Sequence, residues 1–449
     1  MLTLLAFIFV VGVLITIHEA GHFVVARLLG APVEVFSIGF GKRLWGFERG
    51  GTDYRISLIP LGGYVRIIGL GPDESDVVRG EAAETQLLPR WRRALILLAG
   101  PLTNIVAAVL FVALAFTMGV ETAAYLEEEP VVGWVAPGSA ADVAGVREGD
   151  AVRAIGGDEV ELWRDLEIAL LTAGSGEITL TVEREGRSFD IPIVLGSGNQ
   201  YGFSDSGIEP RLEAIVQPVP GGPAAAAGLE AGDRVLSIQR KPVDEHTAVA
   251  VHQYYDLPRL IEPLPGEEII IEVERDGARL SFELTTRNEG GQGKIGVGAV
   301  FPTIDLRLAP LPALRAGFDE CRRMTLQTFK VIGQLFTGRT SIRQMSGPVG
   351  IAQISGQAAR SGVQALIMFM GVISLQLGIF NLLPIPILDG GHLTIMGFEA
   401  LIRRDLPQRV KERILEVGFY LLILLMVVVT FNDIVGRLPE SVRQFFFRG

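Results

Sequence analysis

Residues 4–29 read LLAFIFVVGVLITIHEAGHFVVARLL, and this stretch decides what kind of fold the chain has. Residues 1–17 carry no charged side chain, and the apolar pattern continues past His22 to Leu29. About 20 apolar residues are enough for a helix to cross a bilayer, so residues 1–29 are predicted to span a membrane. A cleaved signal peptide is not expected, because no basic residue precedes the apolar run and no small-residue cleavage pattern follows it.

Ionisable side chains lie inside this predicted span, in the motif His18-Glu19-Ala20-Gly21-His22. On a helix, positions i and i+4 share one face, so His18 and His22 can converge on one metal ion with Glu19 beside them. The motif alone is common by chance. Inside an apolar span, however, such groups cost several kcal/mol unless they are paired, hydrated or bound to a metal. The motif therefore favours a functional site.

The composition fits a chain that combines membrane spans with soluble domains. Hydrophobic residues make up 49% of the 449 residues and charged residues 20%. The net charge of −11 gives no basic field, so nucleic acid is not an expected partner. Cys321 is the single cysteine, so neither an intrachain disulfide nor a multi-thiolate metal site can form. Any metal must be held by histidine and carboxylate side chains.

Three further apolar runs are long enough to cross a bilayer, which gives four predicted spans, at residues 1–29, 94–118, 365–392 and 415–433. Basic residues concentrate in the connecting segments 30–93 and 393–414, which are therefore predicted to be cytoplasmic. The long block between the second and third spans and the tail 434–449 should then lie outside. Arg339, Arg343 and Arg360, with three arginines of the tail, point weakly the other way.

A catalytic zinc site has three protein ligands, so a third ligand must come from another part of the chain. Asp389 follows the third apolar run in the stretch NLLPIPILDG, Asn381–Gly390, where two prolines interrupt the helix. Broken helix at membrane depth is tolerated where it lines a cavity, and the depth of Asp389 matches that of the histidines. His392 is the competing ligand. In a soluble loop, an aspartate before a glycine pair would be an ordinary turn residue.

The block between the second and third spans contains an internal repeat. Ala144–Val152, AGVREGDAV, matches Ala227–Val235, AGLEAGDRV, and Val182–Gly186 matches Val273–Gly277. The repeat predicts two copies of a small, mainly β domain, at 125–205 and 206–305. Its A-G-x-x-x-G-D-x-V pattern resembles bacterial PDZ domains, which bind peptides by adding them to a sheet edge.

A steric filter above the membrane is an equally weighted alternative to peptide binding by the two copies. An extra stretch at His246–Leu264 of the second copy, with Tyr254 and Tyr255, could cover its groove. The segment 306–364 follows, and within it Leu314–Met345 mixes apolar with basic residues, which predicts an amphipathic helix at the membrane surface. This helix is hypothesised to couple the two copies to substrate entry.

Together these motifs resemble the site-2 protease family of intramembrane zinc metalloproteases. The sequences HEAGH in the first span, GPLTN at Gly100–Asn104 in the second and NLLPIPILDGGH in the third correspond to that family, as do the tandem PDZ domains between spans two and three. The fold expected is a polytopic α-helical membrane protein with four transmembrane helices, a membrane-associated β-hairpin and two tandem, mainly-β PDZ domains.

The resemblance implies a zinc endopeptidase. Zn²⁺ would be bound by His18, His22 and Asp389, and Glu19 would be the catalytic acid/base. The implied substrates are single-span membrane proteins, in particular anti-sigma factors of envelope stress signalling, and remnant signal peptides. The implied place is the bacterial inner membrane, with the PDZ copies periplasmic, where they would contact peptide segments, and the active site toward the cytoplasm.

A substrate helix must unwind before its carbonyl can be attacked, and the extended strand then needs a partner. Thr52–Ile67 alternates apolar and polar side chains, and Gly62-Gly63 is predicted to form a turn before Tyr64. The resulting β-hairpin is expected to pair with the unwound substrate. The family implies the same role for this Gly-Gly segment and a hydrogen bond from Asn381 to the substrate backbone. A helix cap or an interhelical bond is the alternative for Asn381, and Asn104 is expected to be a packing residue.

Two rival functions fit parts of the sequence. A non-catalytic scaffold with structural zinc would present the PDZ copies, but an intact Glu19 and an open fourth ligand position argue against it. A transporter would use the intramembrane charges as a relay. Transporters more often repeat their spans, whereas the repeat in this chain lies in the soluble part.

Overall fold

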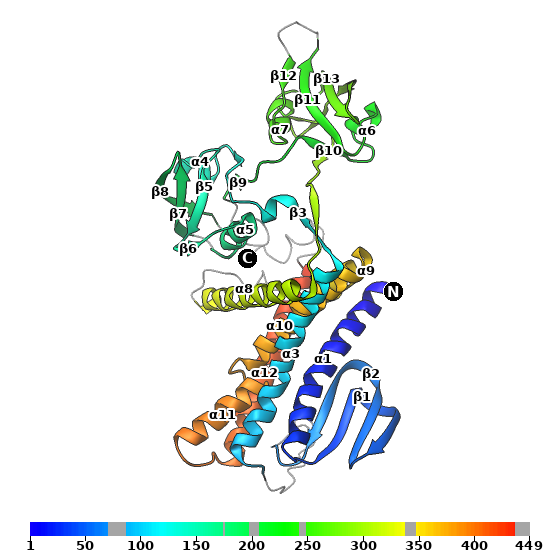
Figure 1. The fold of residues 1–449 in the computed structure, drawn as a ribbon, viewed down its shortest axis with the longest axis vertical. Coiled ribbons are helices and arrows are strands. Elements are labelled where there is room, and N and C mark those ends of the chain that lie inside the picture. The colour runs from blue at the N-terminus through cyan, green and yellow to red at the C-terminus, as the bar shows by residue number, and fades with distance from the viewer. Residues whose placement is uncertain (71–86, 174–175, 197–205, 242–247, 337–346, 436–449) are drawn as a thin grey trace. The chain divides into compact units, whose positions relative to one another are not determined.

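The structure, a computed structural model, describes residues 1–70, 87–173, 176–196, 206–241, 248–336 and 347–435. Its contacts divide the chain into two units. The first combines Met1–Val120 with Leu306–Gly449 and holds the long apolar helices, and the second, Glu121–Asp305, holds the β domains (Figure 1). The predicted combination of apolar helices with β domains is confirmed.

Four helices in the described part of the chain are long and apolar enough to cross a membrane, by length and composition. They are α1 (Leu2–Leu28), α3 (Arg90–Met118), α10 (Val363–Leu382) and α12 (Gln408–Val435). Each coincides with a predicted span. The second and fourth begin earlier than predicted, at Arg90 and Gln408, because the basic residues ahead of each apolar run join the same helix.

Helix α3 packs against both α1 and α10, and small residues allow the close approach. A Cβ atom on Gly21 of α1 would lie 2.5 Å from Thr103 Oγ1 of α3, and one on Gly378 of α10 would lie 2.7 Å from Ile105 Cγ1. Backbones that approach this closely are typical of helix contacts in membranes. Helix α3 is therefore the central element to which the other two are fitted.

The chain after α10 departs from the predicted loop at 393–414. Residues 383–388 form an irregular break, and helix α11 (Asp389–Leu401) follows before α12 begins. The break is held tightly against α11, because a Cβ on Gly390 would lie 2.3 Å from the carbonyl oxygens of both Leu382 and Leu383. Ile387 within the break has a φ of 82°, in the left-handed region that β-branched residues avoid.

The predicted hairpin is present, but its turn was predicted at the wrong place. Strands β1 (Val33–Arg49) and β2 (Thr52–Ile67) join through Gly50-Gly51, both with positive φ, whereas Gly62-Gly63 lies inside β2. Both strands fold back on themselves, so Ile38 of β1 pairs with Gly63 on one side and with Ile56 on the other. The end of β2 from Gly63 onward pairs only with the start of β1 among the described strands, and it is therefore an edge of the sheet.

Two more helices complete the first unit within the segment predicted to be amphipathic. They are α8 (Pro310–Phe336) and α9 (Pro348–Ser361). One side of α8 buries Ala313 and Cys321 against α3 and α10, while Phe318, Leu326 and Phe329 remain exposed. This two-sided distribution agrees with the predicted amphipathic helix, although residues 337–346 lie outside the described chain.

The second unit contains two halves with the same order of elements, except that the second half has two additional short strands before its last strand. After β3 (Val120–Ala123) and the 3₁₀ helix η1 (Ala124–Glu127), the first half comprises β4 (Trp134–Val135), α4 (Ala140–Ala144), β5 (Ala151–Ile155), β6 (Asp158–Glu159), α5 (Trp163–Thr172), β7 (Gly176–Arg184), β8 (Arg187–Leu195) and β9 (Ile208–Glu209). The second comprises β10 (Ile215–Pro218), α6 (Pro223–Ala227), β11 (Asp233–Arg240), β12 (Ala248–Ala250), α7 (Asp256–Ile261), β13 (Glu268–Arg275), β14 (Ala278–Thr285), β15 (Arg287–Glu289), β16 (Gln292–Lys294) and β17 (Val297–Ala299), followed by β18 (Thr303–Leu306). Because β9 pairs with β4, the first half extends to Glu209, beyond the predicted limit of 205.

The repeated sequence marks the same ion pair in both halves. Arg184 donates two hydrogen bonds to Asp150, at 2.6 and 2.7 Å, and Arg275 donates two to Asp233, at 2.6 and 2.8 Å. Both aspartates are fully buried. A buried carboxylate requires such a partner. Within each half, the Asp of the first repeated motif and the Arg of the second motif are therefore needed together.

Aromatic side chains connect the two halves within this unit. Trp134 of the first half stacks on Tyr255 of the second, with ring centroids 4.6 Å apart and planes inclined by 3°. The Tyr255 hydroxyl donates to Glu209 of the first half at 3.1 Å. The extra stretch of the second half therefore reaches its neighbour through Tyr255, while Tyr254 bonds to Val297 O in its own half at 3.3 Å. His246 lies outside the described residues.

Candidate metal centre

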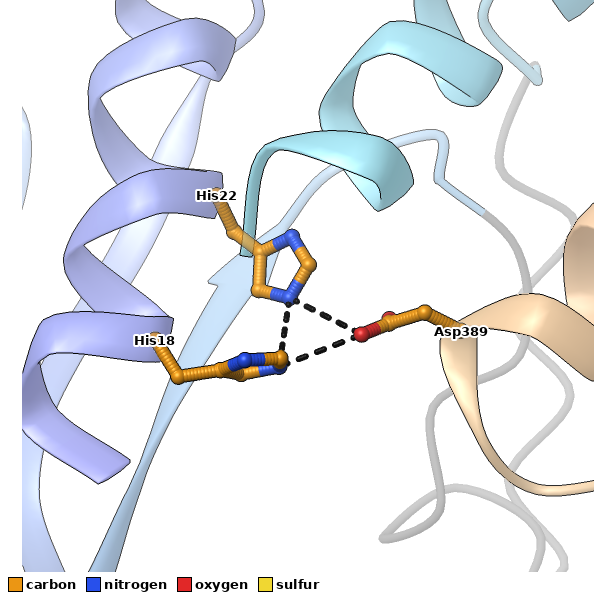
Figure 2. A group of neighbouring side chains, drawn as sticks. All are labelled: His18, His22 and Asp389. Carbon is orange, nitrogen blue, oxygen red and sulfur yellow. Dashed lines mark hydrogen bonds and ion pairs between the residues drawn. The ribbon is translucent and has the colours of Figure 1, made fainter. Parts of the chain in front are cut away.

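Three side chains from two distant segments meet inside the helical unit, as Figure 2 shows: His18 and His22 of α1 and Asp389, the first residue of α11. The Nε2 atoms of the histidines lie 3.1 Å apart. Asp389 Oδ2 lies 3.1 Å from His18 Nε2 and 3.5 Å from His22 Nε2. One nitrogen or oxygen atom of each residue thus points to a common centre.

These separations suit a metal ion. Tetrahedral zinc with bonds of about 2.0–2.1 Å places its ligand atoms roughly 3.3 Å from one another, close to the three observed distances. Two imidazole nitrogens with one carboxylate oxygen are also a donor set that zinc accepts in catalytic sites, where a fourth position stays open. The residues present therefore fit Zn²⁺.

The two candidates for the third ligand differ in whether they lie with the histidines. Asp389 lies with the histidines in a group whose ligand atoms are all within 4.8 Å of one another. His392 does not belong to this group, although it lies in the first turn of the same helix. Asp389 is also more than a turn residue, because its carboxylate faces into the bundle and its side chain is only 14% exposed.

Helix α3 contacts both histidines and restricts their orientation. The sequence did not predict these contacts. His22 Nδ1 donates to the Ile96 carbonyl at 2.7 Å, and Asn104 Nδ2 lies 3.2 Å from His18 Nδ1. Between them, Gly100 faces both imidazole rings, and a Cβ on it would lie 2.3 Å from His22 Nε2 and 2.9 Å from His18 Cε1. The positions 96, 100 and 104 share one face of α3 because they are four residues apart.

The expectation that Asn104 only packs near the site is therefore wrong, since its amide contacts a candidate ligand directly. The signal was available in the sequence. Gly100 and Asn104 are separated by one helical turn, as are His18 and His22, and two helices with this matched spacing can place four functional positions on one interface. What the sequence did not supply was the pairing of α1 with α3.

The bond from His22 to Ile96 also fixes the state of that imidazole. A carbonyl oxygen only accepts hydrogen bonds, so Nδ1 must carry the proton. In neutral imidazole the lone pair then lies on Nε2, the atom that points to His18 and Asp389. The hydrogen bond to the α3 backbone thus leaves Nε2 of His22 free to offer its lone pair to a cation.

Glu19 and the edge of β2 lie beside one another. A Cβ on Gly63 would be 3.7 Å from Glu19 Cγ and 2.7 Å from the carbonyl oxygen of Ser37. Gly62 faces the ring of Phe40, which in turn stacks on Tyr64 with ring centroids 6.1 Å apart. The glycine pair therefore brings a strand edge, without intervening side chains, to the carboxylate of the motif.

Asn381 lies in the last turn of α10, partly exposed, just before the helix break. Within the described residues, its side chain forms neither the interhelical bond nor the helix cap that was considered as an alternative. Its amide therefore remains available for another partner.

Comparison with known proteins identifies the family. A family model described as peptidase family M50 matches residues 6–425. The chain belongs to peptidase family M50. The regulator of sigma-E protease RseP of Salmonella typhimurium is 35% identical over 454 residues, covering 96% of this chain and 98% of the relative. The Escherichia coli K12 protein of that name is 34% identical over 458 residues, with 96% and 98% covered.

The name of a further relative includes the metal. A Ralstonia nicotianae protein that bears the name of a zinc metalloprotease is 33% identical over 473 residues, covering 97% of this chain and 98% of the relative. The family and these relatives confirm the resemblance indicated by the motifs and the predicted enzyme class, a zinc metalloprotease. With its four long apolar helices, the chain is a membrane protein.

Proposed function

We propose that this M50 peptidase cuts the transmembrane segments of single-span membrane proteins, with His18, His22 and Asp389 as zinc ligands and Glu19 as acid/base. The observation that carries this proposal is the convergence of both Nε2 atoms and Asp389 Oδ2 within 3.1–3.5 Å inside an apolar helical bundle. Isolated ionisable groups in such surroundings are costly, and a shared cation offsets that cost.

The chemistry divides between the metal and the chain. Bound zinc would polarise the scissile carbonyl and lower the pKa of an attacking water. Glu19, one residue along the helix from His18, takes a proton from that water and returns it to the leaving amine. His22 is held by the Ile96 carbonyl in the tautomer that keeps Nε2 free of a proton.

The edge of β2 is proposed to hold the unwound substrate. A strand edge offers unpaired main-chain groups to an extended peptide. Gly62, Gly63 and Tyr64 lie on this edge, and Gly63 is next to Glu19, which would align a paired strand with the carboxylate. Asn381, with an available amide near Asp389 in the chain, is the proposed second contact to the substrate backbone.

The placement of the domains is proposed from charge and sequence pattern. The four apolar helices would cross the bacterial inner membrane, with the metal centre toward the cytoplasm and the second unit in the periplasm. The two halves of that unit would be PDZ domains that contact periplasmic peptide segments or limit the size of what passes. The name of the relatives, regulator of sigma-E protease, supports an anti-sigma factor as substrate, and remnant signal peptides are a further class.

One assay tests the activity. Purified protein is incubated with a single-span substrate, with and without a zinc chelator, and the Glu19→Gln variant is run in parallel. We expect cleavage that the chelator abolishes and zinc restores, and no cleavage by Glu19→Gln. Asp389→Ala should lose bound zinc, whereas His392→Ala should retain it. Cleavage that persists under chelation or in Glu19→Gln would refute the proposal.

A further inference from the structure

The side-chain amide of Asn104 is completely buried beside His18. As placed, its Nδ2 lies 3.2 Å from His18 Nδ1. Its Oδ1 is buried and has no hydrogen-bond partner among the described residues. A buried carboxamide oxygen without a partner loses roughly 1–3 kcal/mol of solvation, so this arrangement is unfavourable unless something else compensates.

The position of His18 adds a second conflict. Its Nε2 faces Asp389 Oδ2 and His22 Nε2, so Nε2 is the atom that offers a lone pair to a cation. Neutral imidazole carries one proton, which must then reside on Nδ1. The NH₂ group of Asn104 also only donates. With zinc in place, the Nδ1–H of His18 and the NH₂ group of Asn104 would both be donors and would face each other. The Oδ1 atom of the same amide, which can accept, would have no partner.

We propose that Asn104 accepts a hydrogen bond from His18 Nδ1–H through Oδ1 and thereby holds this ligand in its zinc-binding tautomer. The inference rests on the proposed metal site. A half-turn of the amide exchanges Oδ1 and Nδ2 in place, and such exchanges are decided by the hydrogen-bond network and not by shape. The exchange removes the opposed donors and gives Oδ1 a hydrogen-bond partner. Of the polar atoms of this amide, only the NH₂ group then lacks a partner among the described residues.

Helix α3 also provides a hydrogen-bond acceptor for the Nδ1 atom of the other histidine, His22. Ile96 of α3 accepts from His22 Nδ1 at 2.7 Å, and Asn104 lies eight residues, about two turns, farther along the same face. One acceptor is a backbone carbonyl and cannot rotate, while the other is a side chain and can. Helix α3 thus supplies one acceptor for each histidine, on either side of Gly100.

One contact between α3 and α10 at this position uses the main chain of Asn104 and not its side chain. The hydroxyl of Ser374 on α10 donates to the main-chain oxygen of Asn104 at 2.8 Å, and this bond does not involve the amide. Asn104→Leu keeps the number and branching of the side-chain heavy atoms but removes the acceptor. Asn104→Asp keeps an acceptor and removes the NH₂ group. The pair of variants therefore separates acceptance from donation.

The experiment measures zinc affinity by chelator competition in the full-length protein, together with the thermal stability of the zinc-free protein. Loss of a hydrogen-bond partner behind a ligating histidine typically weakens metal binding by about 10–100-fold. We expect a loss of this size for Asn104→Leu and an affinity within about threefold of the parent for Asn104→Asp. If the Asp variant does not fold, Asn104→Thr replaces it, because its hydroxyl oxygen can accept; it should then bind zinc more tightly than Asn104→Leu.

Controls separate the possible failures. Gln376→Leu removes another amide of the bundle, which bonds to Thr328 at 3.1 Å, and it should leave zinc affinity unchanged. Equal affinities of parent and Asn104→Leu would mean that Asn104 only packs, and equal losses in the Leu and Asp variants would mean that it donates. Either result overturns the inference. If instead His18→Ala does not weaken zinc binding, the proposed metal site itself is wrong.

Discussion

Gly100 lies so close to His22 that a Cβ atom on it would fall 2.3 Å from Nε2, the atom that faces Asp389. Helices α1 and α3 can therefore approach each other at the candidate metal centre only because residue 100 is a glycine and has no side chain. The contact also reaches His18, whose Cε1 would lie 2.9 Å from the same Cβ. The close packing of α1 on α3 therefore also determines where the two imidazole rings lie.

Gly100→Ala should weaken zinc binding strongly while leaving the fold in place. The added methyl must displace one of the two imidazoles, and a shift of about 1 Å in a reacting group can reduce activity by about 100-fold. Zinc affinity and proteolysis should therefore fall together. Gly397→Ala is the matched control, since Gly397 lies on α11 with nothing within 4 Å of the added Cβ. Equal zinc affinity in both variants would show that the rings have room to move.

Ile387 should be one of the few positions where glycine stabilises more than alanine. Its φ of 82° strains any side chain with a Cβ, at a cost of about 1–2 kcal/mol. Ile387→Gly and Ile387→Ala both remove the isoleucine side chain, but only glycine relieves the backbone. We expect the Gly variant to be more stable than the Ala variant by about 1 kcal/mol in thermal unfolding. The opposite order, which is usual at ordinary φ values, would contradict the strained conformation.

Asp233 should make the second half of the β unit sensitive to acid. Burial raises the pKa of this carboxyl, but hydrogen bonds from Arg275 and from the Glu230 amide outweigh burial and hold the pKa below its ordinary value of 3.8. A lowered folded-state pKa stabilises the fold above the unfolded-state value, and this contribution disappears as pH falls through the folded-state value. The acid sensitivity should therefore appear below about pH 4.

Asp233→Asn tests this prediction by hydrogen exchange in β11 and β13. At pH 7 we expect protection in these strands to fall by about 2 kcal/mol, because the substitution removes a charged acceptor from a buried pair. The difference from the parent should shrink as pH approaches 3. Asp276→Asn is the control, since asparagine tolerates the φ of 51° at that turn. A pH-independent difference would mean that packing, and not charge, carries the effect.

Trp134 and Tyr255 should be energetically coupled across the two halves. Their stacked rings, 4.6 Å apart, predict an interaction of about 1 kcal/mol in a double-mutant cycle with Trp134→Ala and Tyr255→Ala. Tyr255→Phe keeps the ring and removes the bond to Glu209, so it separates stacking from hydrogen bonding. Hydrogen exchange of β4 and β9 gives the readout. Strictly additive losses would show that the rings touch without stabilising the interface.

The sequence by itself determined the chemistry and most of the elements. An uncharged span around His18-Glu19-Ala20-Gly21-His22 makes ionisable groups too costly to be incidental, and the repeated Gly-Asp stretches predict two alike β domains. These features depend on local composition and periodicity, which the sequence contains in full. The enzyme class followed from the same motifs and agrees with the family.

Only the tertiary structure decided which residues complete the site. It brought Asp389, and not His392, to the two histidines, placed the turn of the hairpin at Gly50-Gly51 instead of Gly62-Gly63, and put the amide of Asn104 beside His18. Each outcome depends on which helix or strand lies against which, at separations of a few ångströms. Period and hydropathy define the faces of an element, but the close approach of α3 to α1 through Gly21 and Gly100 pairs those faces.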